Sequence, residues 1–180
     1  MKDLEELAVA ISQVNIASDR VASIIGRPAL RGHIGEFIAS KVFNIQLHES
    51  AAHKGSDGVL LDGVLAGSTV NVKFYGQHDG LLDMSEDALP DVFLVLTGPK
   101  GSAASSSGQV RPICIEHLFL IPGTEALADA KSRNVLIGVT TSFPNAFWDE
   151  REVYPMSRSK ELNLTQDQIP LLKLFSFKPS

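Results

Sequence analysis

The sequence predicts a single-domain mixed α/β fold, and three observations lead to this prediction. Two amphipathic segments come first, a hairpin pattern follows them, and an apolar strand then precedes strands interleaved with helices. The 180 residues are 44% hydrophobic and 21% charged, which is the composition of a globular chain with its own core. We therefore expect a mixed sheet flanked by helices, with an amphipathic helix at the N-terminus.

Two helices are expected before the first strand. Along residues 3–25, apolar side chains recur at spacings of three and four with a break at Ser18: they are Leu4, Leu7, Ile11, Val14, Val21 and Ile25. This stripe predicts a helix packed on the domain, and a seam between two copies is the alternative. A second helix is expected from about residue 29 to residue 43, with Glu36 directed away from its apolar face.

Residues 57–75 are expected to form a β-hairpin, because two strand-like arms flank a turn at residues 63–67. In the second arm apolar and polar residues alternate from Val70 to Tyr75, so Asn71 and Lys73 share one face. A regular register would place Asp57 nearly across from Lys73, and a slip of one residue would reverse the faces.

The rest of the chain predicts further strands and helices around one more buried strand. Residues 91–97 form an apolar run that is typical of a strand buried on both faces. Strands are also expected at residues 110–121 and 135–141, and helices near 125–132, with Thr124 as its cap, and at 144–153. An apolar segment covers residues 169–177. The expected organisation is one domain, with an N-terminal helix (1–26), a core (29–142) and a C-terminal helix and tail (143–180).

Charge and composition exclude some classes of protein. The net charge of −5 argues against a protein that mainly coats nucleic acid, although a mildly basic segment (27–56) adjoins a strongly acidic one (57–91). No apolar run approaches the roughly 18 residues of a membrane span, and the first residues lack a signal-peptide layout. A single cysteine, Cys114, excludes an internal disulfide. We expect no membrane association and a cytoplasmic location.

Glu36, Asp57 and Lys73 are the candidate chemical centre. The carboxylates of Glu36 and Asp57, with the backbone carbonyl of Val72, have the oxygen ligands that hold Mg²⁺ or Mn²⁺. Lys73 would orient or deprotonate an attacking water and offset phosphate charge. If the helix bearing Glu36 covers the face of Lys73, the ammonium also needs a carboxylate partner. The structural alternatives are a cross-strand ion pair between Asp57 and Lys73 and an ordinary solvated Glu36.

Basic and polar side chains near this centre are candidate phosphate contacts: they are Arg31, His33, His53, Lys54 and Ser56. A zinc site among His33, His48 and His53 is an alternative, although their spacing matches no HExxH-type motif. In the acidic segment, Asp79 is the best-placed candidate for a further metal ligand. The chain has no nucleophile elbow, P-loop or GxGxxG motif. The sequence therefore lacks the usual motifs of serine hydrolases and of nucleotide- and dinucleotide-binding proteins.

These motifs carry a resemblance to a known fold. Two short motifs resemble the restriction-endonuclease-like PD-(D/E)xK core: they are Gly55-Ser56-Asp57-Gly58 and Val70-Asn71-Val72-Lys73. They follow a helical Glu36 and precede the apolar run 91–97, which is the order of that core. The resemblance covers roughly residues 31–141 and implies a helix, three strands, a helix and a strand. Three sequence segments also resemble an uncharacterised bacterial domain family, for which no activity is known: they are residues 31–36, 53–58 and 71–76.

Asn71 departs from the PD-(D/E)xK pattern, which has Glu or Asp two residues before the lysine. An asparagine offers a carbonyl oxygen to a cation but no negative charge. Either Glu36 supplies the second carboxylate, as in relatives of this fold, or the site is catalytically weak or inactive. The resemblance thus implies a Mg²⁺-dependent endonuclease that cleaves DNA, with Glu36, Asp57, Asn71 and Lys73 as catalytic residues. The alternative is an inactive domain of the same fold that binds a nucleic acid or protein partner, and a homodimer or a partner subunit also remains open.

Overall fold

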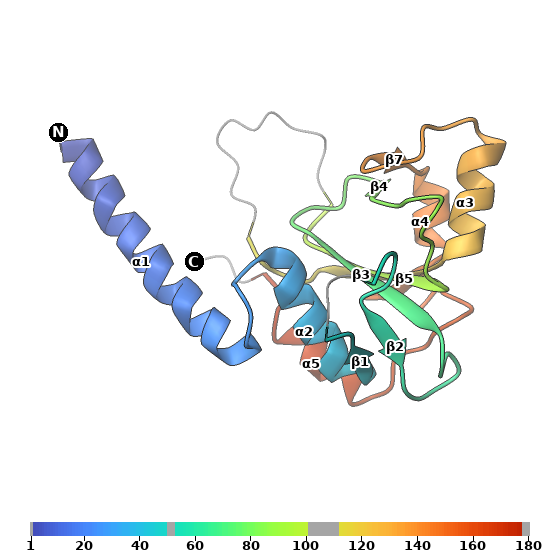
Figure 1. Cartoon of the computed structure of the whole chain (residues 1–180), viewed down its shortest axis with the longest axis horizontal. Helices are drawn as coiled ribbons and strands as arrows, with labels where there is room; N and C mark the ends of the chain where they lie inside the picture. The colour runs from blue at the N-terminus through green and yellow to red at the C-terminus, as the bar shows by residue number, and fades with distance from the viewer. Residues whose placement is uncertain (1, 50–52, 101–111, 178–180) are drawn as a thin grey trace.

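A six-stranded mixed sheet forms the centre of the protein in the computed structural model, which describes residues 2–49, 53–100 and 112–177 (Figure 1). Its strands, in spatial order, are β1 (Ile45–Leu47), β2 (Gly58–Leu60), β3 (Thr69–Tyr75), β5 (Val92–Thr97), β6 (His117–Pro122) and β8 (Glu152–Tyr154). Strands β3 and β5 run parallel, and the other neighbouring pairs of this sheet run antiparallel. The expected hairpin is confirmed as the pair β2 and β3.

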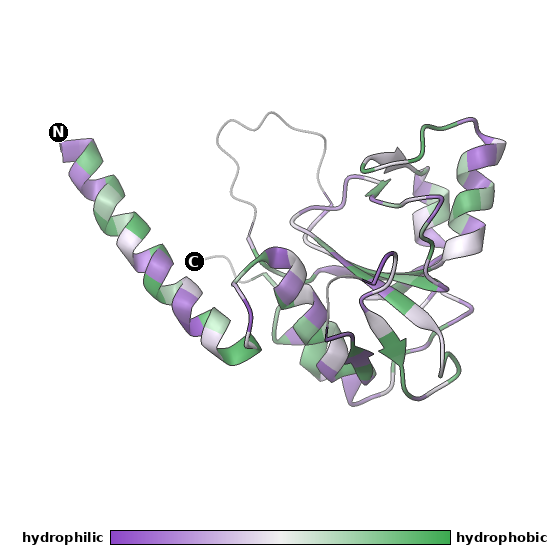
Figure 2. Ribbon diagram, in the orientation of Figure 1, coloured by the Kyte–Doolittle hydropathy of each residue, from purple (hydrophilic) through white to green (hydrophobic). Residues whose placement is uncertain are grey.

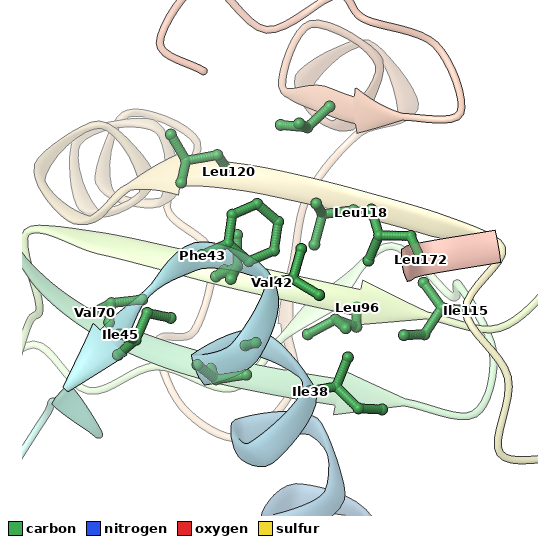
Figure 3. Packing of buried hydrophobic residues seen from close by; sticks show 14 of the residues in the cluster. Ile38, Val42, Phe43, Ile45, Val70, Leu96, Ile115, Leu118, Leu120 and Leu172 are labelled. Carbon is green, nitrogen blue, oxygen red and sulfur yellow. The ribbon is translucent and has the colours of Figure 1, made fainter. Parts of the chain in front are cut away.

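Helices cover both faces of this sheet, as the sequence predicts. On one face α2 (Arg31–Phe43) and α5 (Gln168–Lys173) pack over the larger core cluster, where Val42, Leu118 and Leu172 lie close together (Figure 3). On the other face lie α3 (Gly123–Ser132), α4 (Asn145–Asp149) and the small sheet of β4 (Leu81–Leu82) with β7 (Thr141–Ser142). The α/β class with a helix-flanked mixed sheet is therefore confirmed.

Strand β5 is the central buried strand, as its apolar run predicts. All six residues of β5 are buried, because it pairs with β3 on one side and β6 on the other while helices cover both faces. Phe93 and Val95 join the cluster under α3 and α4, whereas Leu94 and Leu96 join the cluster under α2. A strand with no solvated face favours apolar residues, and this explains the run from Val92 to Leu96.

Helix α2 is held close to β3. A β-carbon built on Gly35 would lie 2.8 Å from Cβ of Phe74, so only glycine allows this separation of helix and strand. The helix ends at Phe43 because Asn44 adopts a left-handed conformation (φ 51°) and donates its backbone N–H to the carbonyl of Ser40. This close packing fixes the position of Glu36 relative to the β2–β3 edge.

Helix α1 (Lys2–Ile25) projects away from the rest of the molecule, and Figure 2 shows apolar and polar residues along its free length (Figures 1 and 2). It contains no buried residue, and Val21 and Ile25 at its C-terminal end are half-buried against the core under α2. The helix itself was predicted correctly. The expectation that its apolar stripe packs on the domain is wrong for most of its length.

Some predicted elements differ from the structure. Residues 135–140 form no strand, because Thr141 Oγ1 donates to the Gly138 carbonyl and accepts from its N–H, which closes a turn and leaves Leu136 and Val139 exposed. Helix α3 begins at Gly123 without a side-chain cap, so Thr124 is not its cap. The strand expected at 110–121 begins at His117, with residues 110 and 111 outside the described part, and the helix expected at 144–153 covers only Asn145–Asp149.

The C-terminal residues complete the domain. Strand β8 adds an edge to the main sheet, and α5 packs beside α2 with Leu172 fully buried. Gln168 donates a hydrogen bond from Nε2 to the Val42 carbonyl at 2.9 Å. Within the described residues, no helix combines the length and apolar character needed to cross a membrane.

Candidate functional site

Strand β3 separates a core face from a polar face, as the alternation predicts. Val70, Val72 and Phe74 are buried under α2, whereas Asn71 and Lys73 lie half-buried on the opposite face. This corrects one expectation, since the helix that bears Glu36 does not cover the face of Lys73. The side of the sheet that holds Lys73 is instead bordered by the segment after β4.

Asp57 lies next to Asn71 rather than Lys73. Gly58 pairs with Val70 in the β2–β3 ladder, so the residue before Gly58 falls beside Asn71. The Asp57 N–H donates to the Val70 carbonyl at 2.8 Å, and its Oδ2 accepts from the Val72 N–H at 2.7 Å. The expected position across from Lys73 is therefore wrong by two residues, and the Asp57 carboxylate is fixed by the backbone of Val72.

The segment before Asp57 is also held firmly. Gly55 has a φ of +84°, and a β-carbon on it would lie 2.4 Å from the Ala88 carbonyl oxygen, so both conformation and space require glycine. The Gly55 carbonyl accepts a hydrogen bond from Nδ2 of Asn71 at 3.3 Å. The segment from Gly55 to Gly58 thus fixes Asp57 at the edge of β3.

The electrostatic surroundings of Asp57 raise the pKa of its carboxyl above the ordinary value of 3.8. Burial is the largest cause, and the negative charge of Glu36 adds to it. The Val72 N–H acts in the opposite direction, as do the positive charges of Lys73 and Arg27. The charges of Glu36 and Lys73 therefore both act on the Asp57 carboxyl. Among the described residues, Asp57 makes no hydrogen bond to either of them.

Glu36 is already paired in this structure. Its side chain is 15% exposed, and Oε2 accepts a hydrogen bond from Nη1 of Arg27, which follows the end of α1. The sequence indicated only that Arg27 belonged to a basic segment. A partner nine residues away, separated from Glu36 by the break between two helices, leaves no periodic signal in the sequence.

Lys73 pairs with Asp83, which lies partly in solvent and is not the buried carboxylate expected under a covering helix. The Lys73 ammonium donates to Oδ2 of Asp83 at 2.9 Å, with side chains 20% and 43% exposed respectively. The Asp83 N–H donates to the Tyr75 hydroxyl at 2.9 Å, and burial raises the pKa of Tyr75 to about 12. Asp79, the expected contributor from the acidic segment, is exposed and contacts none of these groups in the interactions that the structure describes.

Asn71 holds an unpaired oxygen. Its Nδ2 donates to Gly55, but its buried Oδ1 has no hydrogen-bond partner within the described part of the chain. A buried carbonyl oxygen without a donor is costly in a folded protein, so it marks a place where a cation or a donor group would be stabilised.

The candidate phosphate contacts fall into two groups. Ser56 lies beside Asp57 and is within 3.1 Å of Nε2 of His48, and the His48 ring stacks on that of His53 at 4.0 Å. Lys54 is exposed in the same segment. His53 and Lys54 of this group are exposed to solvent, in the segment that leads to Asp57.

The other two candidates are bound to the protein's own backbone. Arg31 donates from Nη1 to the Pro112 carbonyl at 3.1 Å and lies over the Phe74 ring, while Nδ1 of His33 is 2.9 Å from the Pro28 carbonyl. They flank the start of α2 and do not join the group around Asp57.

No group of three or more His, Cys, Asp or Glu side chains is placed to hold a metal ion among residues 2–49, 53–100 and 112–177. A cation at this site would therefore depend on two carboxylates supplemented by neutral oxygen atoms. Comparison with protein families and with curated protein sequences finds no match for this chain.

Proposed function

We propose that this protein is a Mg²⁺-dependent, endonuclease-like enzyme that hydrolyses phosphodiester bonds of DNA. The observation that carries the proposal is the half-buried Asp57 carboxyl, with its raised pKa, beside the buried unpaired Oδ1 of Asn71. Carboxylate and amide oxygens are the ligands that Mg²⁺ prefers. A cation there would relieve the cost of burying one charge near Glu36 and one orphaned oxygen.

The residues that would hold the cation are Glu36, Asp57 and the Val72 carbonyl, with Oδ1 of Asn71 as a neutral donor. Mg²⁺ or Mn²⁺, when bound, supplies positive charge for the phosphate and acidifies a water molecule. The donor set fits a hard cation, although it carries fewer charges than three carboxylates would. Arg27 competes for Glu36, so we expect weak cation binding in the absence of nucleic acid.

Lys73 has the position and charge to act on the substrate. Its ammonium lies on the same face of β3 as Asn71 and is oriented by Asp83, which the Tyr75 hydroxyl holds in turn. In the proposed reaction Lys73 donates a hydrogen bond to a phosphate oxygen or orients the attacking water. The exposed Lys54 and the edge of the His48–His53 pair would contact flanking phosphates.

Incubation of the purified protein with plasmid, single-stranded and branched DNA tests this function. We expect cleavage that requires Mg²⁺ or Mn²⁺, and a loss of about 100-fold or more in Asp57→Ala and in Lys73→Ala. Asp167→Ala, just before α5, and Lys173→Ala, at its end, are matched controls, because both side chains are exposed and belong to the far end of the chain. Cleavage that survives both site substitutions would refute the proposal.

A second candidate function is favoured by the two ion pairs of the site. Arg27 neutralises Glu36 and Asp83 neutralises Lys73, so each charged group other than Asp57 already has a partner. An inactive domain of the same architecture that binds a nucleic acid or protein partner would have such a site. This alternative predicts no cation binding at Asp57 by calorimetry and no cleavage.

Salt dependence then separates the two partners of this alternative. Retention on immobilised DNA that falls steeply with salt would indicate a nucleic-acid partner, since phosphate contacts release counterions. DNA that is not retained at low salt would indicate a protein partner.

A further inference from the structure

Helix α1 exposes a long apolar stripe that the protein itself does not cover. Leu4, Leu7, Ile11 and Val14 are 70%, 53%, 51% and 62% exposed. They follow the spacing of three and four residues that brings side chains to one side of a helix. Contiguous apolar surface of this kind on a soluble protein marks an interaction site.

The residues beside this stripe allow another helix to come close. Ala8 and Ala10 flank it at the positions that are commonly charged in helix pairs. Small side chains at flanking positions let two helices approach closely and add apolar contact. The stripe with its alanine borders therefore fits a helical partner better than a flat surface.

We propose that two copies of this chain associate through antiparallel α1 helices, with Leu4 facing Val14 and Leu7 facing Ile11 of the second copy. This alignment uses only residues with free apolar surface, because Val21 and Ile25 already pack on the chain's own core. It also brings the Ala10 residues of the two copies together beside the axis that relates them. At each level along the helix pair, one apolar side chain of the first copy then faces one of the second.

The charges of α1 favour a second copy and the antiparallel direction. Residues 7–18 contain no charged side chain, so this stretch has no charges by which a partner of opposite charge would recognise it, whereas a second copy offers the same uncharged surface. Asp3, Glu5 and Glu6 lie near the N-terminus of the helix. Parallel helices would bring these acidic groups side by side, and antiparallel helices separate them and oppose the helix dipoles.

Matched substitutions test the association. Ile11 lies in the proposed seam, whereas Val9, which is 60% exposed, lies on the opposite side of the helix. In sedimentation velocity across micromolar concentrations, we expect twice the chain mass for the wild type and for Val9→Glu, and the single-chain mass for Ile11→Glu. Because both side chains are exposed, neither change should alter folding, which circular dichroism verifies.

Cysteine crosslinking tests the direction of the helices. Ala10→Cys should form a disulfide-linked dimer under mild oxidation, whereas Ser12→Cys, on the polar side of α1, should remain largely monomeric; the native Cys114 is buried. A monomeric or tetrameric wild type, loss of the dimer in Val9→Glu, or equal crosslinking of the two cysteine variants would overturn the proposal.

Discussion

At the scale of single residues, Asp57 is the group on which the candidate site depends. Burial and Glu36 raise its pKa, so the folded protein binds the Asp57 proton more tightly than the unfolded chain does. The ionised carboxylate therefore reduces stability at neutral pH, and this loss disappears as the pH falls through its folded and then its unfolded pKa. The same carboxylate is kept where a cation would be attracted.

The first prediction concerns Asp57→Asn, which keeps an oxygen that accepts from the Val72 N–H. Without Mg²⁺ we expect this variant to melt at a higher temperature than the wild type at pH 7, because it removes a buried charge. The difference should shrink towards pH 4 in a calorimetric pH series. Asp167→Asn, an exposed control, should show no such trend. A variant that is less stable at pH 7 would contradict the electrostatic account.

Asn71→Glu supplies the second prediction, because it introduces a carboxylate two residues before Lys73, where the PD-(D/E)xK pattern has one. We expect at least tenfold tighter Mn²⁺ binding by calorimetry and increased DNA cleavage, since a second carboxylate would stand beside Asp57. Without metal the variant should be less stable, because the new carboxylate lies half-buried near Asp57 and the bond to Gly55 is lost. Asn163→Glu, at an exposed position, is the control; unchanged Mn²⁺ affinity would argue for the inactive binding domain.

The site was predictable where it depended on local pattern and not where it depended on loops. Alternation in β3 placed Asn71 and Lys73 on one face, whereas the expected cover of that face by the Glu36 helix, on which a buried carboxylate partner depended, is absent. The identity of that partner, Asp83, depends on the path of the segment after β4. The pairing of Asp57 depends on the hairpin register, which the long turn between β2 and β3 leaves undetermined in the sequence.

At the scale of elements, the contact between α2 and β3 sets the position of Glu36. Gly35 and Phe74 form that contact, and the third prediction is that Gly35→Ala destabilises the protein by about 1–3 kcal/mol, because the new methyl group forces the helix away from the strand. Urea unfolding measures this change. The shift should also weaken the influence of Glu36 on Asp57.

Gly32→Ala is the control for that prediction within the same helix. A β-carbon at Gly32 meets no atom within 4 Å, so the substitution adds helix propensity without a clash. We expect it to be neutral or stabilising by up to about 1 kcal/mol. Equal destabilisation by both substitutions would mean that loss of glycine, rather than the contact with Phe74, is responsible.

Elements were predicted best where the pattern reports burial directly. The apolar run of β5 and the alternation of β3 reflect their two faces, so both strands appear in the sequence. Residues 135–140 carry a similar apolar character, but a strand also needs a partner with free backbone groups. The turn closed by Thr141 and Gly138 leaves this segment outside the sheet.

At the scale of the whole molecule, the two ends of the chain behave differently. The N-terminal α1 projects from the domain, whereas the C-terminal α5 closes the core beside α2. The sequence did not distinguish them, because α1 has the longer apolar pattern and the tail has only one apolar segment. What decides packing is whether a complementary surface lies within reach, and α2 offers one to α5.

The last prediction follows from this closure of the core. Leu172 of α5 is fully buried in the core, so Leu172→Ala should reduce the free energy of unfolding by about 2–5 kcal/mol, through lost apolar contact and the cavity that remains. Leu174, two residues later, is 68% exposed, and Leu174→Ala should change stability by less than about 0.5 kcal/mol. Urea unfolding followed by tryptophan fluorescence suits both variants, because the single tryptophan, Trp148, is buried in the cluster on the opposite face of the sheet. A loss of stability in Leu172→Ala reported from that distant position would indicate that the C-terminal helix and the six-stranded sheet unfold as one cooperative unit. An unchanged midpoint would instead mean that α5 detaches without affecting the sheet.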